Sequence, residues 1–111
     1  MTQAVYVQDD ESVDYTPTID VAAGDVVVQA DLVGIATKPI KANQLGALAV
    51  EGVFDFAKAT SGGSALAAGT SVYWDDTANV VTTTATGNKL IGKVVRAAAD
   101  ADATVRVRLM Q

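Results

Sequence analysis

The sequence predicts a small all-β protein, a β-barrel or sandwich of about eight or nine short strands with at most one or two short helical turns. Half of the 111 residues are apolar, and valine, which favours strands over helices, is concentrated in short runs. Glycine-rich and acidic turns separate these runs. The length fits a single β domain over residues 1–111, because either half would be too small to bury a useful core.

Four candidate strands precede residue 38. Ala4–Gln8 ends at an acidic turn, and Ser12–Ile19 alternates apolar with polar residues. Pro17 cannot donate a backbone hydrogen bond, so this second strand lies at a sheet edge or ends there. The β-branched run Val26–Val28 and the segment Asp31–Thr37 complete the set.

Gly46–Ala57 is the longest candidate strand. One face carries Leu48, Val50, Gly52, Phe54 and Phe56, and the other carries Glu51, Val53 and Asp55. A glycine inside a strand predicts a bend or bulge at Gly52. The next segment, Lys58–Gly69, is rich in small residues and is predicted to be a loop with one short helical turn at Ser64–Ala68.

The clearest hairpin joins Ser71–Trp74 to Asn79–Thr84 through an Asp-rich turn. A tight turn at Gly87-Asn88 then leads into the strand Lys89–Ala97. The last strand, Thr104–Met110, alternates strictly. We expect its inward side chains to be Val105, Val107 and Leu109, and its outward side chains to be Arg106 and Arg108.

A short pattern occurs twice in the chain. Its first copy is Ala22–Asp25, then Val26–Val28, then Leu32-Val33-Gly34, and its second is Ala67–Thr70, then Ser71–Tyr73, then Leu90-Ile91-Gly92. The second copy is longer because it contains the extra hairpin. The pattern indicates either an internal duplication or chance recurrence in a chain rich in Ala, Val and Gly.

The composition argues against catalytic and cofactor chemistry. Cysteine is absent, which excludes a thiol nucleophile and fits synthesis in a reducing host cytoplasm. Histidine, the commonest general base near neutral pH, is absent too. We find no phosphate-binding loop, no secretory signal and no apolar stretch of about 20 residues. We therefore expect no enzymatic activity, no cofactor and no membrane partner.

Two clusters of carboxylates could bind a divalent cation through their oxygen atoms, or could instead stabilise tight turns. They are Asp9, Asp10, Glu11 and Asp14, and Asp75, Asp76 and Asn79. Neither cluster matches a calcium-binding loop, and Asp and Asn commonly satisfy backbone groups in tight turns. We therefore expect no metal site.

The aromatic side chains allow two interpretations. Tyr6, Tyr15, Tyr73 and Trp74 could stack nucleic-acid bases, but their neighbours are acidic rather than basic. We therefore predict no nucleic-acid partner. The residues expected to anchor the core or a subunit interface are Phe54, Phe56, Tyr73 and Trp74.

The net charge of −5 is distributed unevenly. Residues 1–36 contain seven acidic residues and no Lys or Arg, whereas residues 86–111 contain five basic residues and two acidic ones. An acidic front and a basic back would suit head-to-tail contacts between subunits. Simple solvation of strand faces explains the same charges.

Several segments together resemble a family of small tailed-phage head proteins known as capsid cement or decoration proteins, often labelled RecA/RadA-like phage recombinases. The matching segments are AGDVVV (23–28), LVGIAT (32–37), VEGVFDFAKAT (50–60), AAGTSVYWDDTANVVTTTATGN (67–88), LIGKVV (90–95) and TVRVRL (104–109). They follow one another in order and cover most of the chain from residue 23. The recombinase label finds no support, because a RecA-type ATPase needs a phosphate-binding loop and a much longer chain.

The resemblance implies a virion structural protein that binds the exterior of a phage head, strengthens it and commonly forms a homotrimer. Its partners would be the major capsid protein and other copies of the chain. Two alternatives stay open: another head–tail accessory or spike-base protein, or a recombination accessory protein that binds single-stranded DNA.

The first 18 residues match that family least and contain no basic residue. One interpretation is an N-terminal arm that adds a strand to a sheet edge of the capsid protein, with Val5, Tyr6, Val7 and Tyr15 as contacts. The other interpretation is an ordinary first strand, or edge strands, of the domain itself.

Overall fold

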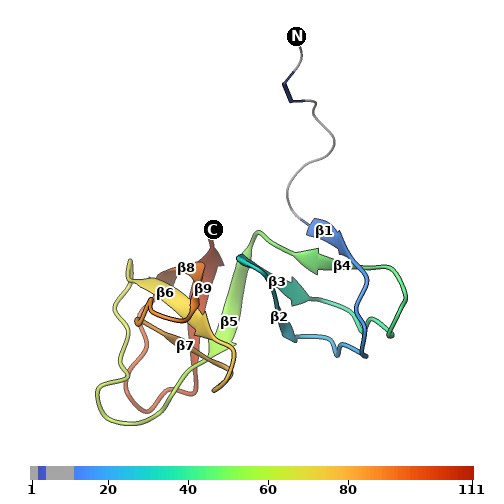
Figure 1. Cartoon of the computed structure of the whole chain (residues 1–111). Coiled ribbons are helices and arrows are strands. Elements are labelled where there is room, and N and C mark those ends of the chain that lie inside the picture. Colours follow the sequence, from blue (N-terminus) through green and yellow to red (C-terminus); the bar gives the residue numbers. More distant parts are fainter. Residues whose placement is uncertain (1–2, 5–11) are drawn as a thin grey trace.

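The computed structural model in Figure 1 describes residues 3–4 and 12–111. This part of the chain forms nine strands and contains no helix, which confirms the all-β prediction. The strands make two antiparallel sheets, and neither sheet closes into a barrel. The structure therefore fits a sandwich, and the barrel alternative is wrong.

The first sheet contains β1 (Ser12–Tyr15), β2 (Val26–Gln29), β3 (Leu32–Ala36) and β4 (Gly46–Ala49). Their spatial order is β1-β4-β3-β2, so β1 and β2 are the two edges. Pro17 is buried just beyond the end of β1. The expectation that this proline marks an edge strand and its end is confirmed.

The second sheet contains β5 (Val53–Ala57), β6 (Ser71–Asp75), β7 (Val80–Thr82), β8 (Lys89–Arg96) and β9 (Thr104–Leu109). Their order is β5-β9-β8-β6-β7. The edge strands β5 and β7 come close to each other, and Lys58, which directly follows β5, forms an isolated parallel bridge with Val81 of β7. In β9 the residues alternate between exposed and buried as expected, with both arginines outward.

Two local predictions are wrong. Gly46–Ala57 is not one strand: β4 belongs to the first sheet and β5 to the second, and the chain turns between them at Gly52, whose φ is +119°. Ser64–Ala68 is not helical, because Leu66 is buried and exchanges two backbone hydrogen bonds of 2.9 Å with Ala98. In both segments, burial against a distant strand decides the backbone conformation.

The repeated sequence pattern corresponds to a repeated structure. In the first copy the amides of Asp25, Gly24 and Ala36 donate to the carbonyls of Ala22 (3.2 Å), Ala36 (2.6 Å) and Asp25 (3.0 Å). In the second copy the amides of Thr70, Gly69 and Val94 donate to the carbonyls of Ala67 (3.2 Å), Val94 (2.7 Å) and Thr70 (2.9 Å). Both glycines have a φ of +88°, a conformation that favours glycine.

The strand order repeats in the same way. The order β1-β4-β3-β2 of the first sheet corresponds to β5-β9-β8-β6 of the second, and β7 is the additional strand. The bridge between Val21 and Ile40 corresponds to the bridge between Leu66 and Ala98. We call β1–β4 the first unit and β5–β9 the second unit.

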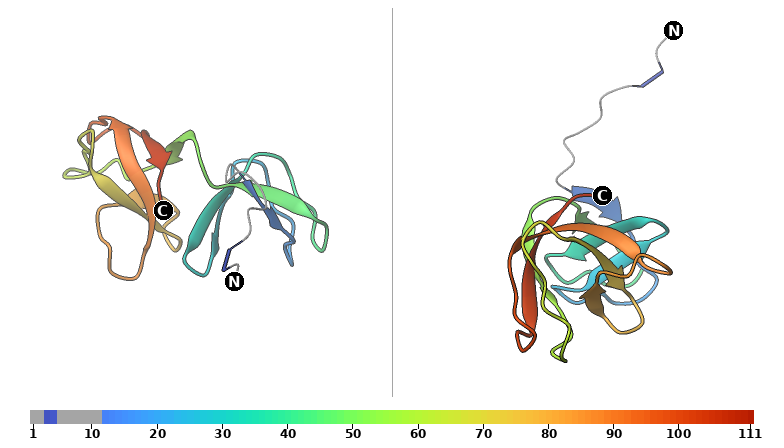
Figure 2. Two further views of the ribbon diagram at one scale, coloured as in Figure 1. Left: turned by 90° about the horizontal axis from the view of Figure 1, so that it is seen from above. Right: turned by 90° about the vertical axis from the view of Figure 1, so that its left-hand side faces the viewer.

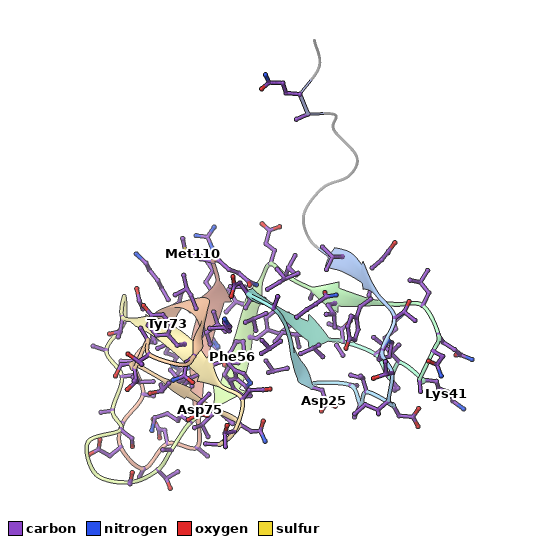
Figure 3. All side chains as sticks on the ribbon, in the orientation of Figure 1. Asp25, Lys41, Phe56, Tyr73, Asp75 and Met110 are labelled. Atoms are coloured by element: carbon purple, nitrogen blue, oxygen red, sulfur yellow. The ribbon has the colours of Figure 1, made fainter. Side chains whose placement is uncertain are left out.

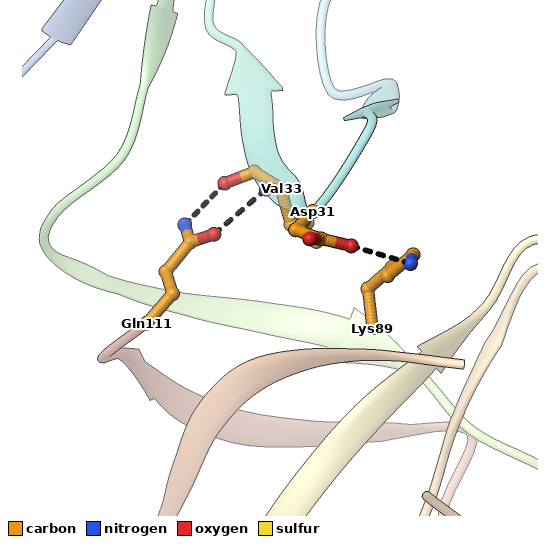
Figure 4. Close-up of polar contacts among 4 residues, drawn as sticks. All are labelled: Asp31, Val33, Lys89 and Gln111. Atoms are coloured by element: carbon orange, nitrogen blue, oxygen red, sulfur yellow. Dashed lines mark hydrogen bonds and ion pairs between the residues drawn. The ribbon is translucent and has the colours of Figure 1, made fainter. Parts of the chain in front are cut away.

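The two units lie side by side, joined by the link between β4 and β5 (Figure 2). The main core cluster crosses the boundary, because Val33 and Ile35 of β3 pack with buried residues of the second unit. Two polar contacts also cross it (Figure 4). The Gln111 side-chain amide pairs with both backbone groups of Val33, and Lys89 Nζ lies 2.6 Å from Asp31 Oδ1.

Candidate interaction surfaces

The outer face of the second sheet gathers cations from two neighbouring strands. Lys93 of β8 lies directly opposite Arg108 of β9, and beyond a bulge Arg96 lies opposite Arg106. All four residues are exposed, and we call them the cationic face. Like charges in directly opposed positions destabilise a sheet, so this arrangement does not serve folding.

One carboxylate offsets part of this charge. The Arg106 guanidinium donates hydrogen bonds to both carboxylate oxygens of Asp55 (3.0 and 3.3 Å). These hydrogen bonds lower the pKa of Asp55 and raise the pKa of Arg106. Within residues 12–111, neither Lys93 nor Arg108 has an ion pair, so both cations stay available to a partner.

Exposed apolar side chains border the cationic face. Val53 lies opposite Arg108 on β5 and is 54% exposed, and Met110, which follows β9, is 43% exposed. Leu90 and Val95 of β8 are 40% and 47% exposed. Arginine next to exposed apolar side chains is typical of protein–protein interfaces. The sequence predicted the outward arginines of β9, but only the β8–β9 register brings Lys93 and Arg96 beside them.

A second surface is the groove along β2. The residues that line it include Val26, Val27 and Val28 of β2, Tyr15 of β1, and Trp74 and Asp76 of the second unit. Three carboxylates, those of Asp20, Asp25 and Asp76, lie along it. Figure 1 shows β2 and β3 on the side of their sheet nearest the second unit, with β1 and β4 on the far side.

The Asp-rich turn between β6 and β7 binds its own backbone. Asp75 Oδ1 accepts hydrogen bonds from the amides of Thr77 and Ala78 (3.0 and 3.1 Å), and Asp76 Oδ1 accepts one from Trp74 Nε1 (3.1 Å). These contacts are the turn chemistry that the sequence indicated. Within the described residues no group of three potential ligand side chains could hold a metal ion.

The residues singled out from the sequence lie in different environments. Val5, Tyr6 and Val7 fall outside the described residues, so their role as partner contacts stays a prediction. Tyr15 is half-buried and packs against a small cluster in the first unit that contains Leu48.

The four other aromatic residues belong to the second unit, where Figure 3 labels Phe56 and Tyr73. Phe56 and Trp74 are buried in the main core, with ring centroids 6.0 Å apart. Phe54 is half-buried and meets Phe56 edge-on at 6.4 Å. Tyr73 is half-buried and pairs with Leu90 across the sheet. These aromatic rings therefore mainly build the core of the second unit.

Sequence reasoning missed one buried cation. The side chain of Lys58, whose residue is 5% exposed, reaches into two loops. Its Nζ lies within hydrogen-bond distance of five oxygens: the carbonyls of Ala59 (2.7 Å), Ala99 (3.0 Å), Asp100 (3.2 Å) and Asp102 (2.9 Å), and Ser64 Oγ (3.4 Å). Lys58 therefore ties the 58–69 loop to the 98–103 loop, which no local sequence signal indicates.

The fold is that of a small all-β protein, and its described part carries two candidate interaction surfaces. Among the residues that the structure describes, no helix is long and apolar enough to span a membrane. The family described as phage cement protein matches residues 7–109, and the chain belongs to this family. No curated protein and no solved structure matches it. Family membership gives the chain a structural, capsid-stabilising role in a virion and confirms the resemblance seen in the sequence.

Proposed function

We propose that this chain is a cement protein that binds the outer surface of an assembled phage head and stabilises it. The match of the cement family over residues 7–109 carries the proposal. Copies bound at many equivalent sites would supply avidity without catalysis, so we assign the chain no enzymatic activity. The major capsid protein is then its partner, and the head exterior its location.

The cationic face is the surface best suited to this contact. It combines unpaired cations with exposed apolar side chains, whereas the chain as a whole carries a net charge of −5. When an acidic protein has one basic face, electrostatic attraction turns that face toward an acidic partner surface before the two proteins touch. We therefore assign a carboxylate-bearing surface of the capsid protein to this face. Nucleic acid fits less well, since Phe56 and Trp74 are buried and cannot stack bases.

Mixing the purified protein with undecorated heads tests the proposed function. We expect it to co-sediment with heads to a saturating, fixed stoichiometry and to raise the temperature at which the heads break. Heads that neither bind the protein nor gain stability at any salt concentration would rule out the cement role.

A pair of charge-reversed variants tests the cationic face. Lys93→Glu with Arg108→Glu should weaken binding to heads at least about tenfold at about 50 mM salt. The matched control, Lys38→Glu with Lys41→Glu, changes the net charge equally on exposed residues of the first unit and should bind like the wild type. Equal binding by both variants would exclude the cationic face.

We also propose that the protein self-associates, most simply as a homotrimer. The resemblance to the cement family motivates this proposal, and a closed ring needs two different surfaces on each copy that complement each other. Sedimentation equilibrium should give about three times the chain mass of 11.4 kDa.

A further inference from the structure

The internal repeat leaves one strand position empty in the first unit. In the second unit, β7 pairs with the outer edge of β6 over Val80–Thr82. The equivalent strand of the first unit is β2, which pairs with β3 on one side only. Among the described strands, no strand covers the other side of β2.

The register shows which backbone groups of β2 face outward. The amide of Ala36 donates to the carbonyl of Asp25 (3.0 Å), so Asp25 faces β3. Hydrogen-bonded and non-hydrogen-bonded positions alternate in an antiparallel pair, so Val27 also faces β3. The amide and carbonyl groups of Val26 and Val28 therefore point to the open edge.

This edge lacks the features that usually protect edge strands. Natural edges are interrupted by proline, lysine or a bulge, because an open apolar edge pairs with other chains. The β2 edge has three consecutive half-buried valines and an uninterrupted register with β3. The groove described above runs along these valines, so an extended segment can approach the edge.

The chain contains one segment that suits this edge and lies outside the nine strands. Ala4–Gln8 alternates apolar residues, is rich in strand formers and carries no charge, so the carboxylates of Asp20, Asp25 and Asp76 do not repel it. The segment precedes β1, which is the opposite edge of the sheet, about 14 Å from β2. A strand on the open side of β2 would lie one spacing farther, about 19 Å from β1, and the four residue steps from Gln8 to Ser12 span at most about 14 Å. The segment therefore cannot reach the open edge of its own chain.

We propose that the open edge of β2 receives the strand Ala4–Gln8 of a second copy of this chain. The proposal rests on the self-association proposed above and names the surfaces that produce it. Each copy donates one strand and accepts one, so the contact is heterologous and can close a ring. Backbone hydrogen bonds to Val26 and Val28 supply the affinity, and the valine side chains set the register.

Two variants remove the two halves of this contact. Deletion of residues 1–8 removes the donated strand and leaves the β2 edge open. Val28→Pro removes an outward amide and leaves the donated strand intact, and proline is tolerated at edge positions that do not donate within the sheet. We expect the wild type to be oligomeric and each variant alone to be monomeric at a protein concentration of about 100 µM. This concentration lies well above a micromolar dissociation constant for self-association.

A mixture of the two variants makes the test specific. The deletion variant can only accept a strand and Val28→Pro can only donate one, so an equimolar mixture should form heterodimers and nothing larger. The control Val28→Thr keeps the amide and the side-chain shape and should stay oligomeric. A mixture that stays monomeric, or either variant keeping the wild-type mass, would contradict the proposal.

Amide hydrogen exchange keeps the proposal testable if Val28→Pro does not fold. A synthetic peptide of residues 1–11 added to the deletion variant should slow exchange of the Val26 and Val28 amides at least about tenfold. Unchanged exchange would overturn the proposal. Deletion that abolishes binding to heads while the oligomer keeps its mass would assign the segment to the capsid instead, and would leave the cement function standing.

Discussion

Lys58 is a residue whose role depends mainly on a loop about 40 residues away in sequence. A lysine that follows an alternating strand would ordinarily be placed in solvent. Here the ammonium group is enclosed by four carbonyl oxygens and a hydroxyl. Three of the carbonyls belong to residues 99–102, and the other two contacts come from Ser64 and from the neighbouring residue Ala59. Every described buried polar side-chain atom has a hydrogen-bond partner, so this site is fully satisfied.

Replacement of Lys58 should therefore be costly. Lys58→Met keeps much of the side-chain volume but leaves carbonyl oxygens of two loops without a donor, which should lower the free energy of unfolding by about 2–4 kcal/mol. Lys41→Met, at an exposed position, is the matched control and should change stability by less than about 0.5 kcal/mol. Urea denaturation measures both, and equal stabilities would refute a structural role for the ammonium group.

Asp55 should contribute to the pH dependence of stability. The hydrogen bonds from Arg106 lower its pKa in the folded state. The folded state therefore gains stability above the unfolded pKa of about 3.9, and loses it as the pH falls through the lower folded value. Asp55→Asn should lower the melting temperature slightly at pH 7 and reduce its fall between pH 5 and pH 2. Parallel melting curves for both proteins across that range would show that the pair contributes nothing.

At the scale of elements, the β8–β9 pairing depends on a close approach at Gly92. A Cβ atom at this position would lie 1.8 Å from the backbone oxygen of Arg108, and the φ of Gly92 is +156°. The register of β6 against β8 shifts beside Gly92. The glycine allows this bulge, and with it β8 pairs with β6 on one side and with β9 on the other. The glycine of the equivalent position in the first unit, Gly34, lies close to Leu48.

Alanine substitution should be far more destabilising at Gly92 than at a glycine with open space around it. Gly92→Ala should destabilise the protein by at least about 3 kcal/mol, because the backbones of β8 and β9 must separate. Gly62→Ala is the control, since a Cβ there meets nothing within 4 Å, and it should be nearly neutral. Thermal melts of the two variants that coincide would contradict this account of the bulge.

The whole molecule should unfold as one cooperative unit. The main cluster joins Val33 and Ile35 of the first unit to the second unit, and Gln111 and Lys89 add polar contacts across the same boundary. Fluorescence of Trp74 reports the second unit, whereas circular dichroism reports both sheets. We expect the two signals to give the same midpoint in urea, as the single domain predicted from the length requires. Two separated transitions would show that the units are independent domains.

The sequence by itself determined the features that depend on short-range chemistry. Alternation in residues 104–109 set the inward and outward faces of β9, the Asp-rich turn between β6 and β7 followed from Asp side chains that bond their own backbone, and Pro17 ended β1. The repeated Ala-Ala-Gly pattern left internal duplication and chance recurrence open, and only the same turn, with a glycine at φ +88° in both units, shows that it corresponds to a structural repeat.

Only the tertiary structure decided which distant segments meet. Periodicity over Gly46–Ala57 could not separate β4 from β5, because alternation is the same whether a strand stays in one sheet or passes to another. The cationic face arises from the β8–β9 register, the Lys58 site from two loops about 40 residues apart, and the open edge of β2 from strand order. Pairing between segments far apart in sequence is selected by the packing of the whole core, which no local pattern encodes.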